Sequence, residues 1–186
     1  MAHPKIESDA LLEKLFELFR ATGYDGASLG QLAEATGLKK ASLYHRFPNG
    51  KEQMAASVLT YANEWIQAHI LAPLHRAGDP ETRLAEALTG FRTLYDDGRK
   101  ACLLRAFSLG SSTSQFSPAV GAAFQALLDG LAHLARDYGH PDAEALRWAE
   151  NTVVALEGAL VVAGAMQKPE LFQRALDQMA TQVRPK

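Results

Sequence analysis

The helical spacing of apolar residues is the feature that most limits what this 186-residue chain can fold into. Residues 8–22 place Leu11 and Phe19 on one side and charged residues on the other, as an amphipathic helix does. No segment alternates polar and apolar residues with the period of a strand. β-Branched residues cluster only briefly, at 153–154 and 161–162. The sequence therefore predicts an all-α fold.

Glycine and proline mark the boundaries of about nine predicted helices. Gly23 ends the first, and the pairs Asp79–Pro80 and Ser117–Pro118 each combine an N-cap residue with a proline that opens a helix. The three N-terminal helices predict a compact head within residues 1–50, followed by a larger body over 51–186. The later helices are expected at 28–36, 39–47, 51–75, 80–95, 99–110, 118–138, 142–167 and from Pro169 onward.

Two short helices joined by a glycine turn form the second half of the head. Ser28 and Gln31 have the spacing of a capping box, and Gly37 suits the left-handed turn that follows. Leu43 and Phe47 lie four residues apart in the next helix, so both point inward. This order is the helix-turn-helix pattern, whose second helix enters the major groove of DNA.

Charge is distributed unevenly along the chain. The net charge is only −2, but no acid occurs from Ala35 to Gly50, whereas the segment from Lys39 to Lys51 carries four cations. A basic patch on a mildly acidic body fits a small DNA-reading head.

The candidate DNA contacts follow from the placement of residues in the head. Cations at the start of the second short helix can reach guanine edges or phosphates, and helix N-termini favour phosphates. The predicted contacts are Ser28, Lys39, Lys40, Ser42, Tyr44, His45 and Lys51.

Residues 8–53 resemble the head of the TetR (tetracycline repressor) family of transcriptional regulators. One departure is Lys39, which stands where members often have a small capping serine or threonine. Two runs in the body are similar to those of the LmrA/YxaF-like branch, at 101–104 and 156–161. The motifs that carry the family resemblance are Ala27-Ser28-Leu29, Gln31-Leu32-Ala33, Gly37-Leu38, Ser42-Leu43-Tyr44-His45-Arg46-Phe47 and Asn49-Gly50-Lys51-Glu52.

The resemblance implies a homodimer that binds a near-palindromic double-stranded operator and is released by a small-molecule effector. We expect a repressor rather than an activator. The family dimerises through its last two long helices, which here are the helices near 118–138 and 142–167. The aromatic content of the body favours an apolar or aromatic effector.

Six aromatic residues are candidates to line the effector pocket, since such pockets are mostly apolar. Taken singly, each is more often an ordinary core residue. Cys102 is interpreted as a packing residue, with a redox sensor as the alternative, and Glu157 faces either the pocket or a dimer partner. The scattered histidines lack ligand spacing, so we expect no metal and no cofactor. The six aromatics are Trp65, Phe91, Tyr95, Phe107, Phe124 and Trp148.

Two other classes of function remain open at this point. The first is a small-molecule-binding or adaptor protein whose head has lost specific DNA binding. The second is an all-α enzyme, which we do not expect because the sequence has no nucleophile elbow, phosphate loop or dinucleotide fingerprint. The polar start lacks a signal peptide, and the apolar run from Val153 to Met166 is too short for a membrane span and predicts a buried helix. A cytoplasmic location is therefore expected.

Overall fold

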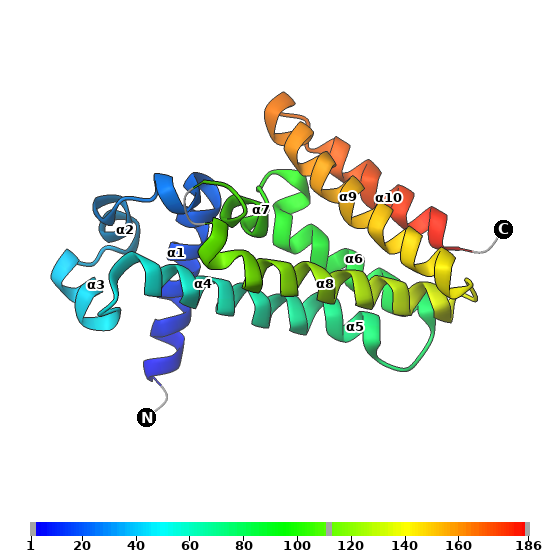
Figure 1. The fold of residues 1–186 in the computed structure, drawn as a ribbon, viewed down its shortest axis with the longest axis horizontal. Helices are drawn as coiled ribbons and strands as arrows, with labels where there is room; N and C mark the ends of the chain where they lie inside the picture. The colour runs from blue at the N-terminus through cyan, green and yellow to red at the C-terminus, as the bar shows by residue number, and fades with distance from the viewer. Residues whose placement is uncertain (1–2, 111–112, 185–186) are drawn as a thin grey trace. The chain divides into compact units, whose positions relative to one another are not determined.

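The computed structural model describes residues 3–110 and 113–184, and all regular structure in these ranges is helical (Figure 1). The predicted all-α fold is confirmed. Three consecutive segments, α4, η1 and α5, form one uninterrupted helical run, so the described residues contain nine α-helical stretches, as predicted. The elements are α1 (His3–Gly26), α2 (Leu29–Thr36), α3 (Lys40–Arg46), α4 (Gly50–Ile66), η1 (Gln67–Leu71), α5 (Ala72–His75), α6 (Pro80–Tyr95), η2 (Asp96–Gly98), α7 (Leu103–Phe107), α8 (Thr113–Asp137), α9 (Asp142–Met166) and α10 (Glu170–Val183).

The chain forms two compact units that are not contiguous in sequence. Unit 1 contains residues 1–64 and 103–120, and unit 2 contains residues 65–102 and 121–186. The predicted division of roles, with a DNA-binding part in 1–50 and a body in 51–186, stays a prediction.

The turns of unit 1 follow local chemistry. Gly23 has φ 71° and interrupts the regular conformation of α1 three residues before its end. Ser28 caps α2 by accepting from the Gln31 backbone N–H, while the Gln31 side chain accepts from the Ser28 backbone N–H, which completes the capping box. Gly37 then closes α2 in the left-handed conformation. The predicted cap and the Gly37 turn are confirmed, whereas Gly23 interrupts α1 without ending it, since α1 continues to Gly26.

An aromatic cluster forms the core of unit 1 and joins its two chain segments. Phe19 and Tyr24 of α1 stack with their ring centroids 6.3 Å apart. Phe107 of α7 lies 5.6 Å from Phe19, and Phe116 of α8 meets the edges of both Tyr24 and Phe107 at 5.2 and 5.1 Å. These contacts fix residues 103–120 onto the first helix.

The long run from Gly50 to His75 changes its hydrogen-bonding register in the middle. Residues Gln67–Leu71 form a π-helical turn, in which the Ala72 N–H reaches back to the Gln67 carbonyl. Pro73 follows directly, has no N–H to donate and clashes with the carbonyl four residues before it in a regular α-helix. The wider π turn therefore relieves the strain that Pro73 would impose on one continuous α-helix.

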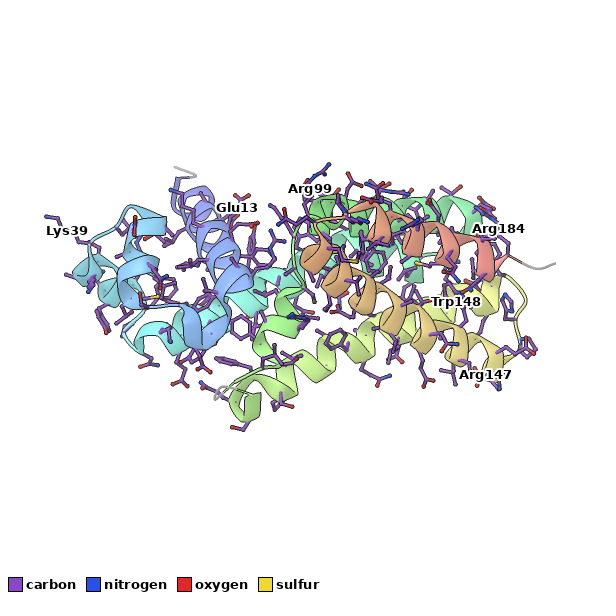
Figure 2. The ribbon with its side chains drawn as sticks, turned by 90° about the horizontal axis from the view of Figure 1, so that it is seen from above. Glu13, Lys39, Arg99, Arg147, Trp148 and Arg184 are labelled. Carbon is purple, nitrogen blue, oxygen red and sulfur yellow. The ribbon has the colours of Figure 1, made fainter. Side chains whose placement is uncertain are left out.

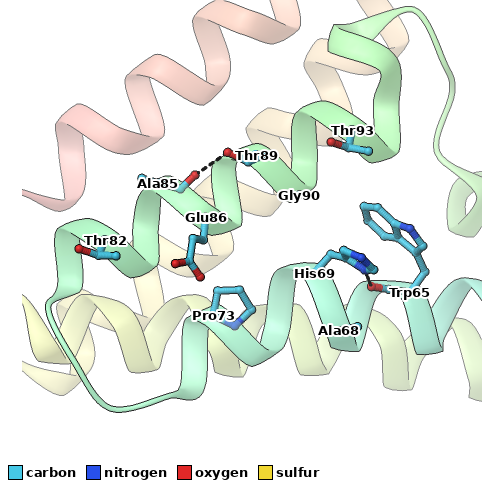
Figure 3. A pocket seen from close by; sticks show the side chains of 10 residues that line it. All are labelled: Trp65, Ala68, His69, Pro73, Thr82, Ala85, Glu86, Thr89, Gly90 and Thr93. Atoms are coloured by element: carbon cyan, nitrogen blue, oxygen red, sulfur yellow. Dashed lines mark hydrogen bonds between the residues drawn. The ribbon is translucent and has the colours of Figure 1, made fainter.

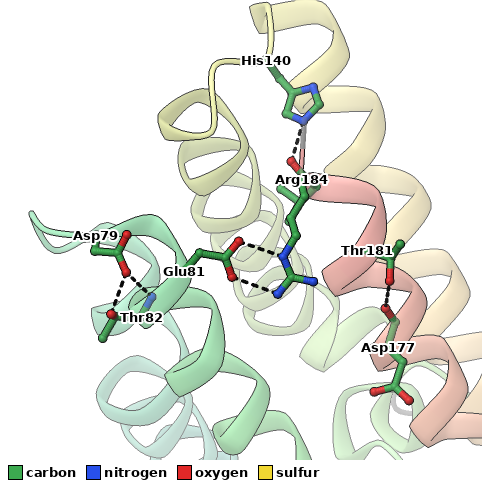
Figure 4. A network of polar contacts seen from close by, with 8 residues as sticks. Asp79, Glu81, Thr82, His140, Asp177, Thr181 and Arg184 are labelled. Carbon is green, nitrogen blue, oxygen red and sulfur yellow. Dashed lines mark hydrogen bonds and ion pairs between the residues drawn. The ribbon is translucent and has the colours of Figure 1, made fainter. Parts of the chain in front are cut away.

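Unit 2 is held by packing and by polar contacts at helix ends. Arg83, 2 % exposed, donates to the Pro73 and Leu74 carbonyls at the end of α5 and pairs with Asp137 at the end of α8. In Figure 4, Arg184 donates two hydrogen bonds of 2.8 and 2.9 Å to Glu81, which hold the pKa of Glu81 below its ordinary value. The ends of unit 2 are thus fixed by charge-assisted contacts as well as by apolar burial.

Two predicted helix boundaries and one predicted burial were wrong. The helix expected at 99–110 spans only Leu103–Phe107, because Lys100 donates its N–H back to Tyr95 and closes α6. Helix α8 begins at Thr113, so Pro118 lies inside it, where the buried Phe116 anchors its first turns. The helix that contains Val153–Met166 is not a buried one, since one of its faces is exposed.

Candidate DNA-binding head and ligand groove

Helix α3 presents most of the predicted contacts on one exposed surface. Lys39 is the N-cap residue and Lys40 the first residue of the helix, and both are exposed, as are Ser42 and His45. Figure 2 shows the Lys39 side chain pointing outward from the end of the head. Leu43 and Phe47 are buried beneath the helix, as predicted. The surface formed by residues 39–46 is called the α3 face below.

Tyr44 links the α3 face to the start of α4. It is 45 % exposed, and its ring lies so near Gly50 that a Cβ there would come within 3.3 Å of the Tyr44 Cε1 atom. Gly50 has φ 66°, so glycine is favoured both by conformation and by this contact. The Tyr44 ring therefore lies beside the start of α4.

Lys51 is half-buried and has internal partners. Its Nζ donates to the Tyr24 carbonyl at 2.9 Å and lies 4.3 Å from the centre of the Tyr24 ring. Burial raises the pKa of the Tyr24 phenol, and the Glu52 and Asp25 carboxylates add to the rise, so the ring stays neutral. Lys51 thus connects the start of α4 to the aromatic cluster of unit 1.

Ser28 and Arg46 complete the polar surface of the head. Ser28 is exposed, but its hydroxyl bonds the Gln31 side chain at 2.7 Å and caps α2, so local structure uses its polar groups. Arg46 was not among the predicted contacts, yet it is exposed in the last turn of α3. Its place in the cation run between Lys39 and Lys51 was the signal that would have included it.

The structure does not bring the six candidate pocket aromatics together at one surface. Phe107 belongs to the core of unit 1, whereas Phe91, Tyr95 and Trp148 are buried in unit 2. Phe124 is partly exposed on α8. Trp65 is the one of the six that lines a groove found in unit 2.

This groove has a volume of about 560 Å³ and lies between the α4–η1–α5 run and α6 (Figure 3). Trp65 and His69 stack at one end, with ring centroids 4.3 Å apart and planes at 14°. Glu86 points from α6 toward Pro73 at the other end, and Thr89 lies between them along α6. The combination of an apolar wall and a few polar groups is typical of small-molecule sites.

Helix α9 exposes an apolar face. By length and composition it would also pass for a membrane-spanning helix, with only 28 % of its most apolar window buried in this chain. Val154 is 71 % exposed, and Gly158, Val161 and Ala165 continue its stripe at spacings of four, three and four residues. A Cβ at Gly158 would meet no atom within 4 Å. The stripe therefore has the spacing of a helix-packing seam but no partner helix within the described chain.

Residues 11–58 match the sequence profile of a family described as bacterial regulatory proteins, tetR family. YxaF and LmrA, two HTH-type transcriptional regulators of Bacillus subtilis, are similar to this chain. YxaF is 35 % identical over 72 residues, which cover 39 % of this chain and 38 % of YxaF. LmrA is 34 % identical over 83 residues, which cover 45 % and 42 %. The matched segment thus spans about two fifths of the length of these relatives.

Solved structures share the fold over nearly the whole chain. A TetR transcriptional regulator from Legionella pneumophila covers 99 % of both chains with a TM-score of 0.80 at 20 % identity. The TetR-family regulator CifR, solved as a cysteine mutant with 26-base-pair operator DNA, covers 93 % of this chain and 95 % of its own with a TM-score of 0.73 at 21 % identity. Residues 11–58 thus match the tetR family, as the sequence predicted, and the whole chain has the fold of solved TetR regulators.

Proposed function

We propose that this protein is a dimeric transcriptional regulator that binds a near-palindromic operator through the α3 face and is released from it by a small molecule. The observation that carries the proposal is the α3 face itself. It exposes Lys39, Lys40 and Arg46 on a helix-turn-helix, with no acid from Ala35 to Gly50. Exposed cations on a recognition helix can contact phosphates and can also donate hydrogen bonds to the edges of guanine bases.

The predicted contacts divide into two roles on this geometry. Lys39, Lys40, Ser42 and His45 are exposed on the α3 face, so we assign them to direct contact with the major groove. Tyr44 sits beside the start of α4, where its hydroxyl and the positive end of the helix dipole would hold one phosphate. Ser28 and Lys51 would contact the backbone and also hold the local structure of the head.

The dimer is proposed to form through α9, with α8 as the second predicted interface helix. The stripe of Val154, Gly158, Val161 and Ala165 would pack against the same stripe of a second copy, since a two-fold interface uses one patch twice. Gly158 has open space around it and would let the two helices approach closely. Covering this face would also account for an apolar helix in a protein that we expect to be cytoplasmic.

The effector is expected to act through the long helical run. This run begins at the DNA-binding head with Gly50 and continues through the π turn into unit 2. A ligand that binds one conformer of unit 2 more tightly would shift the population of that conformer. Occupation of the operator would block transcription, so we expect release by the ligand to relieve repression.

The rival proposal is an adaptor or small-molecule-binding protein of the same fold without specific DNA binding. The two proposals differ in whether binding to a near-palindromic duplex exceeds binding to random DNA. The test is a mobility-shift titration of the full chain on its upstream region at two salt concentrations, with excess random duplex as competitor. We expect a discrete shift that weakens steeply with salt, because phosphate-contacting cations release counterions. Binding that never exceeds binding to random duplex, even after selection from a random library, would favour the adaptor.

The α3 face is tested by Lys40→Ala, with Lys168→Ala as the control, because Lys168 is an exposed lysine of unit 2. If Lys40 contacts a phosphate, we expect operator binding to weaken and the slope of log K against log salt to fall by about 1. If it reads a base, specificity at one position relaxes at a cost of roughly 1–3 kcal/mol. Tyr44→Phe is the companion variant, and Lys51 is a poorer choice because its removal also disturbs Tyr24. Unchanged operator affinity in both variants would contradict the assigned role of the α3 face.

A further inference from the structure

Two of the threonines that line the groove of unit 2 already donate their hydroxyl hydrogens to other groups of the protein. Thr82 donates its hydroxyl hydrogen to Asp79 at 2.7 Å, and Thr89 donates to the Ala85 carbonyl at 2.9 Å. Each oxygen therefore faces a ligand as an acceptor.

The ring of His69 also presents an acceptor to the groove. Its Nδ1 lies 2.9 Å from the Trp65 carbonyl oxygen, and a carbonyl can only accept, so Nδ1 carries the hydrogen. In the neutral ring Nε2 is then an acceptor. The stacking with Trp65 holds both rings in place as a flat wall.

Glu86 is the only formally charged side chain among the described residues that line the groove. Its carboxylate pairs with Arg76 at 2.6 Å, but both side chains are nearly half exposed. Exposed pairs of this kind contribute little, and a carboxylate has room for more than one donor. Glu86 can therefore accept a second cation without losing a strong internal contact.

We propose that this groove binds an organic ammonium with an aromatic body. The flat ring would lie against Trp65 and His69, where a ring face also favours a nearby positive charge. The ammonium would donate to Glu86 and to the threonine oxygens of α6. A carboxylate ligand is disfavoured, because it would meet the Glu86 carboxylate and the acceptor oxygens of Thr82 and Thr89. The assignment deepens the proposed function by naming its effector class, and its role as effector rests on that function.

The groove also touches the π turn, which suits a ligand with an effect on the long helix. Trp65 precedes the turn, His69 lies within it, and Pro73 follows it. A ring seated on the first two residues would hold the run in one of its hydrogen-bonding registers. π turns are frequent at functional sites.

The test uses the two tryptophan indole N–H signals of the full-length protein in NMR, without DNA. Trp65 lines the groove and Trp148 is buried elsewhere in unit 2, and Trp65→Phe assigns the two signals. The probes are 2-naphthylmethylammonium, the neutral 2-naphthylmethanol and 2-naphthoate. We expect the ammonium to shift the Trp65 signal saturably, the alcohol to bind about tenfold more weakly, and the carboxylate to have no effect.

Glu86→Gln removes the charge, and Glu170→Gln is the matched control on α10. We expect Glu86→Gln to weaken ammonium binding about tenfold and to leave alcohol binding unchanged, whereas the control changes neither. Equal binding of naphthoate, an unaltered ammonium affinity in Glu86→Gln, or a shift of Trp148 alone would overturn the assignment. Because no DNA is present, these outcomes do not depend on operator binding. A failure to bind operator would contradict the proposed function and leave the groove assignment intact.

Discussion

At the scale of single residues, the surroundings of His75 change how readily it binds a proton. Its ring stacks on His133 of α8 with centroids 5.3 Å apart. Burial lowers the pKa of His75, and His133 and Arg83 add to the fall, while Asp129 opposes it. The folded protein therefore favours the neutral imidazole more than the unfolded chain does.

The pH dependence of stability follows from this shift. Below the ordinary value of 6.5 the unfolded chain takes up the proton first, so the free energy of unfolding falls as the pH drops through that value toward the folded pKa. We expect His75→Gln to reduce this slope, measured by urea unfolding at several pH values between 7.5 and 5.5. His45→Gln, an exposed histidine of the head, is the control. A slope that is the same in His75→Gln and in the natural sequence would contradict the shift.

In the head, the sequence predicted the helix cap and the glycine turn correctly, but it did not predict contacts between residues far apart in the chain. Ser28, Gln31 and Gly37 act through neighbours a few positions away, so spacing alone was enough to identify the cap and the turn. Lys51 was predicted only as a phosphate contact, but it also donates to Tyr24, which lies 27 residues earlier. A contact that depends on the packing of α1 against the start of α4 leaves no mark in the spacing of residues.

At the scale of elements, the close approach of α6 to the π turn depends on one glycine. A Cβ at Gly90 would collide with the His69 carbonyl oxygen and come within 2.8 Å of Ile70 Cγ1. Backbone cannot yield as a flexible side chain can, so the two helices fit only with glycine here. Only Pro73 points to the π turn in the residue pattern, so a single helix over 51–75 is the prediction that the spacing favours.

We expect Gly90→Ala to lower the free energy of unfolding by roughly 1–3 kcal/mol through overpacking, as measured by urea denaturation. Gly121→Ala is the control, for which we expect no loss of stability. A Cβ at Gly121 meets nothing within 4 Å inside α8, so alanine should be neutral or stabilise the helix by up to about 1 kcal/mol. Equal effects of the two variants would show that the helices separate easily at Gly90.

Element boundaries were predicted correctly where caps and turns act locally. Asp79–Pro80 opens α6 as expected, with the Asp79 carboxylate accepting from the Thr82 N–H at 2.9 Å. Ser117–Pro118 carries the same local signal but lies inside α8. The difference is Phe116, whose ring packs on Tyr24 and Phe107. This long-range contact holds the residues before Pro118 in a helix against the local preference.

At the scale of the whole molecule, the exposed stripe on α9 sets the expected assembly. A monomer would leave Val154 and Val161 in water, and a contiguous exposed apolar face of this kind usually marks an interface. The resemblance to the TetR family predicts the dimer, and the stripe on α9 indicates which residues would meet in it.

We expect Val154→Lys to convert the dimer to a monomer, because two lysines would meet across the two-fold axis. Sedimentation or light scattering would report the change in mass. Leu109→Lys is the control, since Leu109 is 58 % exposed and belongs to unit 1 rather than to unit 2. A Val154→Lys protein that stays dimeric would place the interface elsewhere.

The aromatic cluster of unit 1 determines where the chain can be cut to build a chimeric regulator. Phe107 and Phe116 cover Phe19 and Tyr24, although they come from the second segment of unit 1, which is separated from Glu64 by residues 65–102 of unit 2. A fragment cut after residue 64 would leave these rings in water and lose their packing. Exchange of ligand specificity by grafting a foreign body onto this head therefore requires that residues 103–120 be carried over with it. The part that could be transferred to another regulator therefore consists of two separate chain segments.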